Sequence, residues 1–228
     1  MRSAPASAVL AQAIGARANP YNARPAPVSG CAAVATPTWR AKGRMEPTTQ
    51  LDLPGVFVYE PKVFGDDRGF FMESWNRRTF RDATGLDPDF VQDNHSRSLG
   101  GVLRGIHYQL TPHAQGKLLR VTTGAVWDVA VDLRRSSPTF KQWAGVELTA
   151  ENHKQLWIPS GFGHGFLVLS DVADVVYKAT AHFAPDYDRS LRWNDPDLGI
   201  AWPLGDRPPI LSAKDQAAPL LADAQIFD

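Results

Sequence analysis

An all-β protein, with two antiparallel sheets packed as a jelly roll, is the fold class that this 228-residue sequence predicts. About ten short runs rich in β-branched and aromatic residues follow one another after residue 50, with turn residues between them. In the run 126–133, apolar Val129, Val131 and Leu133 alternate with small or acidic residues, which is typical of a strand with two unlike faces. The hydrophobic fraction of 43% is sufficient for one well-buried domain, or for one domain with a tail.

The expected elements follow the chain in order. Strands are expected at 55–60, 70–75, 90–94, 102–109, 117–122, 126–133, 143–148, 155–158, 165–169 and 172–180. Thr123-Gly124 predicts a hairpin-type turn that joins two of these strands directly. A short helix is expected within 76–83, a tight turn or one helical turn at 149–152, and ordered loops with a short helical piece near 213–221. No internal repeat or linker follows residue 50, so we expect one jelly-roll domain at 49–228.

Residues 1–48 differ in composition from everything that follows. Their first 45 positions contain no Asp or Glu and are rich in Ala, Pro, Ser and Arg. We therefore expect a disordered N-terminal extension. Two alternatives stay open: an organelle transit peptide, which is also rich in Arg and poor in acidic residues, and a protein that begins at Met45.

Charge and cysteine content exclude several classes of protein. Basic and acidic residues balance at 24 each, so we expect neither nucleic acid nor a membrane as a partner. The only cysteine, Cys31, excludes an intrachain disulfide framework and fits a reducing compartment, from which we expect a cytoplasmic protein. No apolar run approaches the roughly 18 residues of a membrane-spanning helix. The Gly-rich loops that cradle ATP or NAD and the Gly-x-Ser-x-Gly turn of esterases are absent.

The expected strand 102–109 contains a histidine, a side chain that can gain or lose a proton near neutral pH. His107 is our candidate for a catalytic base, with a hydrogen-bonded structural histidine as the alternative. Arg104, Lys117 and Arg68 are cations that could bind phosphate oxygens or stabilise an enolate, although each alone could equally be a solvated surface charge. The Tyr177 phenol could donate a proton if it faced a cavity; otherwise it is a packed aromatic side chain.

A second histidine, His164, follows a glycine-rich turn at 159–163. The Pro-x-Gly-x-x-His spacing resembles the second half of the cupin signature, in which the histidine often binds metal. The first half needs a His-x-His pair and a glutamate, whereas this chain has His107-Tyr108-Gln109, and His113 follows a proline. Zinc and iron usually need about three protein ligands, so we expect no metal. A metal-dependent cupin oxygenase or isomerase that uses His107, His113 and His164 remains an alternative.

Eight motifs, in order and with nearly regular spacing, resemble the dTDP-4-dehydrorhamnose 3,5-epimerase family. They are FGDDRGFFMESWN (64–76), FVQDNHSRS (90–98), VLRGIHYQ (102–109), QGKLLRV (115–121), QLWIPSGFGHGFLVLSD (155–171), VVYKAT (175–180), WNDPDLGIAWP (193–203) and LSAKD (211–215). The resemblance covers the chain from about residue 50 to about residue 225, and the N-terminal extension lies outside it.

The resemblance implies a cupin-like jelly roll with a few short peripheral helices, a homodimer, and an isomerase that uses no cofactor. The family takes a dTDP-4-keto-6-deoxy sugar, dTDP-4-dehydro-6-deoxy-D-glucose, and inverts C3 and C5 to give dTDP-4-dehydro-L-rhamnose in dTDP-L-rhamnose synthesis. Both carbons flank the ketone, so removal of a proton from either one gives an enolate.

Matching of the motifs also implies roles for individual residues. His107 would take the proton, and Asp215 would pair with His107 to orient its ring and stabilise its charged form. Lys117 would help to hold the negative charge of the enolate, and Tyr177 would return a proton on the opposite face. The implied substrate contacts are Arg68, Phe71, Glu73, Gln92, Asn94, Arg104 and His164, and part of the first motif would reach across the dimer into the neighbouring site.

Two structural questions follow from the resemblance. In a regular strand, Arg104 and His107 would point to opposite faces, although the family uses both; a bulge at Gly105 would reconcile them. The side chain that stacks on the thymine is either His182 or Phe183.

The sequence leaves other functions open. A close variant is a monoepimerase that inverts only C3 or only C5 of such a sugar, and a different class is a non-catalytic binder of sugar nucleotides. Neither the order of the two epimerisations nor the final sugar product can be predicted from the sequence.

Overall fold

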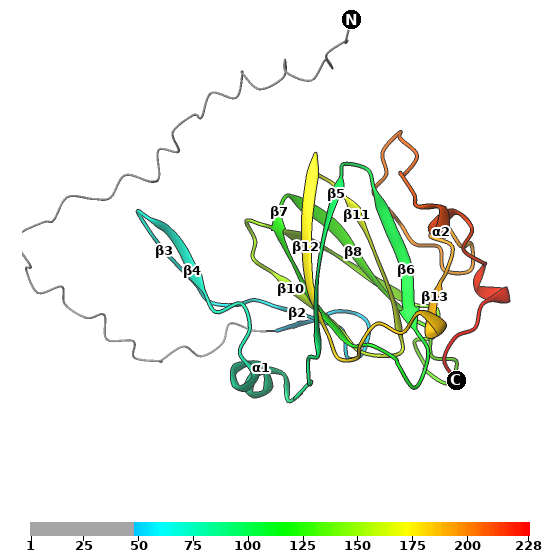
Figure 1. Cartoon of the computed structure of the whole chain (residues 1–228), viewed down its shortest axis with the longest axis horizontal. Coiled ribbons are helices and arrows are strands. Elements are labelled where there is room, and N and C mark those ends of the chain that lie inside the picture. The colour runs from blue at the N-terminus through cyan, green and yellow to red at the C-terminus, as the bar shows by residue number, and fades with distance from the viewer. Residues whose placement is uncertain (1–47) are drawn as a thin grey trace, which may run out of the picture. The chain divides into compact units, whose positions relative to one another are not determined.

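The computed structural model describes residues 48–228 (Figure 1). Apart from its last position, the predicted N-terminal extension at 1–48 lies outside the described residues, as do Cys31 and Met45. The described chain forms two antiparallel sheets that pack as a jelly-roll sandwich, which confirms the predicted fold class. No helix in this described part is long and apolar enough to cross a membrane.

The larger sheet has six strands and the smaller sheet has five. In spatial order, the six-stranded sheet consists of β1 (Thr49–Gln50), β2 (Phe57–Tyr59), β10 (Gln155–Ile158), β7 (Lys117–Thr123), β12 (Val172–Ala179) and β5 (Gln92–Leu99). The five-stranded sheet consists of β13 (Asp188–Ser190), β6 (Leu103–Gln109), β11 (Phe162–Val168), β8 (Ala125–Asp132) and β9 (Trp143–Thr149). Further elements are the hairpin β3 (Val63–Asp66) and β4 (Gly69–Met72), α1 (Arg77–Thr84), α2 (Ala213–Gln216), and the 3₁₀ turns η2 (Pro185–Tyr187) and η3 (Leu221–Asp223).

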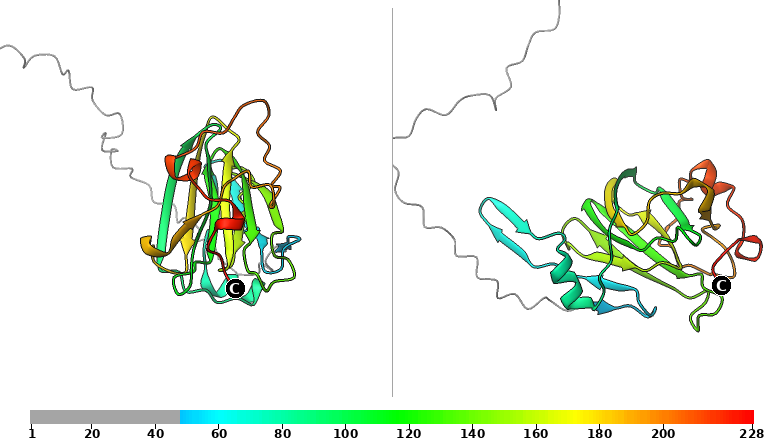
Figure 2. Two further views of the ribbon diagram at one scale, coloured as in Figure 1. Left: turned by 90° about the vertical axis from the view of Figure 1, so that its right-hand side faces the viewer. Right: turned by 60° about the horizontal axis from the view of Figure 1, so that its bottom comes forward.

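Three apolar clusters hold these layers together. The largest lies between the two sheets, where Leu119 and Val175 of the six-stranded sheet belong to the same buried cluster as Phe166 of the five-stranded sheet. The C-terminal segment, orange to red in Figures 1 and 2, covers the outer face of the five-stranded sheet and contributes residues such as Leu221. On the outer face of the six-stranded sheet, Phe80 of α1 packs in the third cluster. Both faces of each sheet therefore carry a buried patch, and burial of this kind is the main stabilising term of the fold.

The predicted helix at 76–83 is confirmed as α1, whose start and end have clear local causes. The Asn76 side chain caps the helix by accepting hydrogen bonds from the backbone N–H groups of Arg78 and Thr79. Gly85 ends it in the left-handed conformation, with φ of 71°. The helix thus takes the chain from the β3–β4 hairpin to β5.

The predicted hairpin at Thr123-Gly124 is wrong. β7 pairs with β10 and β12, whereas β8 pairs with β9 and β11, so Gly124 carries the chain from one sheet to the other. A Cβ at Gly124 would lie 2.0 Å from the Val172 carbonyl oxygen, so the crossing requires glycine. A glycine turn between two apolar runs is equally compatible with a crossing, and the local sequence does not show which sheet the second strand joins.

Other strand boundaries also differ from the prediction. β5 continues to Leu99 although it was predicted to end at 94, β11 begins at Phe162 although it was predicted to begin at 165, and β3 and β13 were not predicted. β13 is only three residues long and has no alternating pattern, and it pairs with the edge of β6. Such short strands depend on the partner that they find and are weakly marked in the sequence.

Candidate active site

The candidate site lies between the two sheets, on the inner faces of β6, β11, β7 and β12. Ile106 and Tyr108 pack in the cluster on the outer face of the five-stranded sheet, so His107 between them points inward. His107 and His164 are directly opposite each other in the β6–β11 pairing, which places two histidines side by side on one inner face. From the facing sheet, Lys117 and Tyr177 lie on the inner side, because Leu119 and Val175, two residues away from them, belong to the core between the sheets.

The bulge needed to bring Arg104 and His107 into one cavity is present at Gly105. Along β11 one residue separates the partners of Arg104 and His107, whereas two residues separate them along β6, so the pairing contains a β-bulge. Gly105 has φ of +114°, and a Cβ there would lie 2.6 Å from the Gly165 Cα and the His164 carbonyl oxygen. Only glycine fits this close approach of two backbones.

His107 and Asp215 form a tight pair. His107 Nε2 lies 2.6 Å from Asp215 Oδ1, although the residues are 108 positions apart in the chain. Burial raises the pKa of the Asp215 carboxyl, but hydrogen bonds from His107, Ser212 and the Gly105 backbone outweigh it and hold the pKa below its usual value. An ionised carboxylate can only accept, so Nε2 carries the hydrogen and Nδ1 of the neutral ring is left to accept a proton.

Lys117 and Tyr177 form the opposite wall of the site. The Lys117 ammonium lies 5.9 Å from the centroid of the Tyr177 ring. Burial lowers the pKa of Lys117 to about 8. The negative charges of Asp128 and Asp188 raise this pKa and so offset part of the effect of burial. Burial also raises the pKa of Tyr177, which is opposed by the positive charge of Arg104. The phenol therefore keeps its proton at neutral pH, and the lysine carries its charge only up to mildly alkaline pH.

We expect the substitution Lys117→Met to stabilise the fold at pH 7 while it lowers activity. In the folded protein the pKa of Lys117 lies near 8 rather than at 10.5, so the unfolded chain holds the proton more tightly. The cost of burying the charged form is therefore fully present below pH 8, decreases between pH 8 and 10.5, and is absent above that range; it amounts to roughly 3 kcal/mol. Urea unfolding should show a gain of about 1–3 kcal/mol at pH 7 and a smaller gain at pH 9.5.

The matched control is Lys154→Met, which changes a partly exposed lysine paired with Glu60 and should alter stability by less than about 0.5 kcal/mol. In the wild type, kcat/KM should fall as pH rises through about 8, because the ammonium form is lost. A Lys117→Met variant that is less stable than the wild type at pH 7 would show that its charge is compensated in the folded state.

His164 is bound to a buried carboxylate that the sequence analysis did not single out. Its Nε2 lies 3.0 and 3.1 Å from the two oxygens of Asp128, and Asp128 is fully buried. Burial lowers the pKa of His164 and raises that of Asp128, so burial disfavours the charged form of each. The alternation in 126–133 did place Asp128 on the face opposite to the apolar residues, which was the available signal.

Three further predicted residues lie on β5 or against it. The Gln92 amide donates to Asn94 Oδ1 at 2.9 Å, and its oxygen accepts the backbone N–H of Phe183 at 2.8 Å. The Arg104 guanidinium donates to Ser98 Oγ at 2.9 Å, which carries its charge from β6 toward β5. Gln92 and Asn94 therefore lie at the end of β5 that pairs with Tyr177 and Ala179, whereas Arg104 binds nearer the other end of β5, from where its charge still acts on Tyr177.

The remaining predicted residues are not in this cavity. Arg68 and Phe71 belong to the β3–β4 hairpin, which projects away from the sandwich (Figures 1 and 2). Arg68 is highly exposed and binds Asp66, and Phe71 is 59% exposed. Glu73 follows the hairpin and accepts hydrogen bonds from Asn76 and Thr79 at the start of α1. Within one chain, these three side chains are thus separate from His107 and Tyr177.

The structure adds Ser212, Asp188 and Lys214 to the surroundings of the site. Ser212 binds Asp215 directly, and Asp188 of β13 forms an ion pair with Lys214 of α2. Both charges act on Lys117, the carboxylate raising its pKa and the ammonium lowering it. Ser212-x-x-Asp215 has the form of a helix cap, a signal that the sequence offered. Nothing in the sequence near Asp188 indicated its position.

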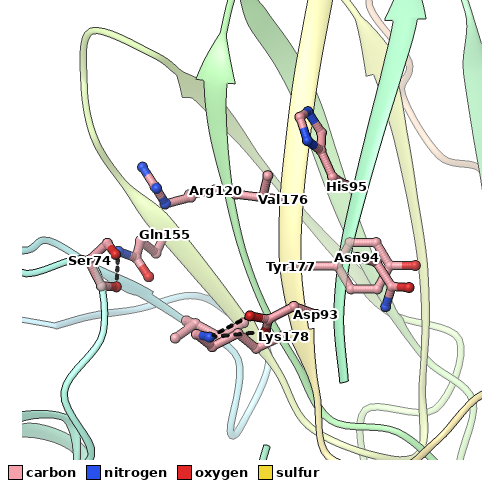
Figure 3. A pocket seen from close by; sticks show the side chains of 10 residues that line it. Ser74, Asp93, Asn94, His95, Arg120, Gln155, Val176, Tyr177 and Lys178 are labelled. Carbon is pink, nitrogen blue, oxygen red and sulfur yellow. Dashed lines mark hydrogen bonds and ion pairs between the residues drawn. The ribbon is translucent and has the colours of Figure 1, made fainter. Parts of the chain in front are cut away.

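A separate cavity of about 340 Å³ lies on the outer face of the six-stranded sheet (Figure 3). Asp93, Arg120 and Lys178 are among the charged side chains that line it, and Lys178 is bound to Asp93. Burial lowers the pKa of Arg120, and within residues 48–228 its guanidinium has neither a hydrogen bond nor an ion pair. Asn94 and Tyr177 lie at the edge of this cavity, but the His107–Asp215 pair is not part of its lining.

Among residues 48–228, no group of three or more His, Cys, Asp or Glu side chains is arranged to hold a metal ion. His107 and His164 are each bound to a carboxylate, and the His113 ring packs against Tyr187 with centroids 4.5 Å apart. The three histidines that a metal-dependent cupin would use as ligands are therefore each in contact with a different side chain.

A family model described as dTDP-4-dehydrorhamnose 3,5-epimerase matches residues 50–223. The chain belongs to this family. A family member from Pseudomonas aeruginosa is 59% identical over 179 residues, which cover 78% of this chain and 98% of the relative. A crystal structure of a family member from Legionella pneumophila in complex with dTDP-4-keto-L-rhamnose has a TM-score of 0.75 and 49% identity, covering 78% of this chain and 94% of that chain. A 3′-monoepimerase from Streptomyces bikiniensis, in complex with dTDP-quinovose, has a TM-score of 0.72 and 41% identity, covering 76% of this chain and 87% of that chain. The predicted family and the predicted class of enzyme, an isomerase, are confirmed.

Proposed function

We propose that the protein inverts C3 and C5 of dTDP-4-dehydro-6-deoxy-D-glucose to give dTDP-4-dehydro-L-rhamnose, without a cofactor, in dTDP-L-rhamnose synthesis. The observation that carries the proposal is the arrangement of His107 on one sheet, paired with Asp215 of α2, opposite Lys117 and Tyr177 on the other sheet. A base and an acid on opposite walls are what an inversion requires. The 59% identity to the Pseudomonas aeruginosa 3,5-epimerase supports this substrate.

The proposed reaction moves one proton at a time. His107 Nδ1 takes the proton from C3 or C5, and the electrons of the broken C–H bond form the enolate with the C4 ketone. The Lys117 ammonium stabilises the negative charge on the enolate oxygen, and the Tyr177 phenol gives its proton to the same carbon from the opposite face. Asp215 keeps the imidazolium in place until His107 and Tyr177 exchange protons with solvent, and the cycle repeats at the second carbon.

Incubation with the keto sugar in heavy water tests this function. We expect deuterium at both C3 and C5 of the product, measured by NMR and mass spectrometry. Deuterium at a single carbon would support the monoepimerase alternative, which the 41% identity to the Streptomyces bikiniensis 3′-monoepimerase keeps open. The absence of exchange at both carbons would overturn the proposal. Loss of exchange on chelation, with stoichiometric metal in the purified protein, would favour the metal-dependent alternative.

We also propose that the protein acts as a homodimer in which the β3–β4 hairpin of one chain reaches the site of the other. The hairpin carries Arg68 and Phe71 away from its own sandwich, and Phe70 is 61% exposed at the same place. β5, which carries Gln92 and Asn94, is an edge strand of the six-stranded sheet and can accept a further strand. The partly buried Arg120, which has no acidic partner among residues 48–228, is also explained by an interface with a second copy.

A heterodimer of two inactive variants tests this arrangement. One chain carries His107→Ala and the other carries Arg68→Ala, each with a different affinity tag. If the hairpin acts in the partner's site, the chain with Arg68→Ala has an intact base and receives an intact hairpin, so the heterodimer should have about half the activity of the wild type. Both homodimers should be nearly inactive. A heterodimer as inactive as they are would place the hairpin in its own chain's site.

Two smaller assignments belong to the same proposal. Phe183 is favoured over His182 for stacking on the thymine, because Gln92 holds its backbone N–H beside the site and its ring is 57% exposed. The cytoplasm is the proposed location, since the single cysteine fits a reducing compartment.

A further inference from the structure

We propose that Ser212 is a positioning residue for the epimerisation: its hydroxyl fixes the Asp215 carboxylate so that the second carboxylate oxygen faces His107. The inference rests on the proposed function and adds to it a residue that does not touch the substrate.

The contacts of Asp215 divide between its two oxygens. Oδ2 accepts the hydroxyl of Ser212 at 2.7 Å, and Oδ1 lies 2.6 Å from Nε2 of His107. The same Ser212 oxygen accepts the backbone N–H of Asp215 at 3.1 Å. Because an ionised carboxylate can only accept, the single O–H of Ser212 is committed to Asp215. Ser212 therefore binds both the backbone and the side chain of the residue that it orients.

The local structure explains why the carboxylate needs this second contact. α2 has only four residues, and the terminal torsion of an aspartate side chain is broad. Without Ser212, the Asp215 carboxylate would be held only by His107 and the Gly105 backbone, both on β6, and it could turn about that torsion and carry the imidazole with it. The hydrogen bond from Ser212 restrains this rotation from the α2 side, while His107 is held by β6. The Asp215 side chain is 3% exposed, so water has little access to replace the hydroxyl.

Ser212 is also the N-cap of α2, and a purely structural role must be separated from positioning. A cap alone predicts that Ser212→Ala lowers stability while the folded enzyme turns over normally. Positioning predicts a lower kcat with nearly unchanged KM, because substrate binding does not involve Ser212. Ser212→Thr keeps a hydroxyl that can both accept and donate, so it should restore kcat.

Ser137→Ala supplies the matched control. Ser137 Oγ donates to the buried Asp132 carboxylate at 2.5 Å, and it also accepts the backbone N–H of Thr139 nearby, but neither residue is in the site. The change in chemistry is the same as in Ser212→Ala. Ser137→Ala should therefore lower stability without changing kcat.

The experiment measures kcat, KM and the rate of deuterium exchange for Ser212→Ala, Ser212→Thr and Ser137→Ala at a temperature where circular dichroism shows all of them folded. We expect kcat and exchange to fall on the order of 10-fold in Ser212→Ala only, with KM changed less than about twofold. Wild-type kcat in Ser212→Ala, or an equal loss in Ser137→Ala, would overturn the proposal.

A proton NMR measurement on the free enzyme tests the same point without turnover. The N–H of His107 that points at Asp215 should give a resonance far downfield, assigned by its loss in His107→Ala. We expect this resonance to shift and broaden in Ser212→Ala and to return in Ser212→Thr. If the wild type catalysed no exchange, the proposed function would fail, whereas an unchanged resonance in Ser212→Ala would overturn the role of Ser212.

Discussion

Replacement of His107 with alanine should remove deuterium exchange at both C3 and C5 and lower kcat by roughly 10²- to 10⁴-fold. The expected loss is this large because, in the proposed mechanism, the imidazole takes the proton in both half-reactions. Asp215 cannot replace it, since its carboxylate is held by Ser212 and its pKa lies below the usual value. Exchange should be followed by NMR of recovered substrate and product, with circular dichroism to show that the variant is folded.

His113→Ala is the control for this substitution. The His113 ring packs against Tyr187 outside the cavity, so its removal should change kcat by less than about threefold. The metal-dependent alternative makes the opposite prediction, because it requires His107, His113 and His164 together. Exchange that continues at either carbon in His107→Ala would show that another group takes that proton.

The fold class was predictable because the period-two pattern of the strands reports burial directly. The chain alternates apolar and small or acidic residues in 126–133, and the structure places Val129 and Val131 in the outer cluster and Ala130 in the core between the sheets. Which of the two sheets each strand joins was harder to predict from the sequence. Gly124 was taken for a hairpin turn because its local sequence is compatible with one, whereas the crossing is set by the pairing of β8 with β9 and β11, which come later in the chain.

In the site, too, features set by neighbouring residues could be predicted, whereas contacts between residues far apart in the sequence could not. The bulge at Gly105 was foreseen from one glycine in a strand and two side chains that had to share a cavity. The contact between His107 and Asp215 joins positions 108 residues apart, and no spacing rule could have paired them without the resemblance. Asp188 was missed for a related reason: its charge acts on Lys117, which lies far away in the sequence and on the other sheet.

Conversion of Tyr177 to phenylalanine should separate the two halves of the reaction. In the proposed mechanism His107 remains able to remove the proton, so exchange should continue, but the acid on the opposite wall is lost. Formation of the inverted product should therefore fall by roughly 10²- to 10⁴-fold. In heavy water, His107 itself returns deuterium to the face from which the proton came. Recovered substrate should then contain deuterium with its original configuration, which NMR can detect.

Tyr108→Phe makes the same chemical change outside the site. The Tyr108 hydroxyl donates to the backbone oxygen of Gln225 at 2.5 Å, so this variant should lose about 1 kcal/mol of stability and keep the wild-type ratio of exchange to inversion. A Tyr177→Phe variant that also kept that ratio would show that another group supplies the proton. If Tyr177→Phe lost exchange and inversion equally, the phenol would instead be needed for proton removal, as a donor to the enolate beside Lys117. Only a variant that exchanges without inverting assigns the returning acid to Tyr177, because the other two outcomes give that step to another group or give the phenol a different role.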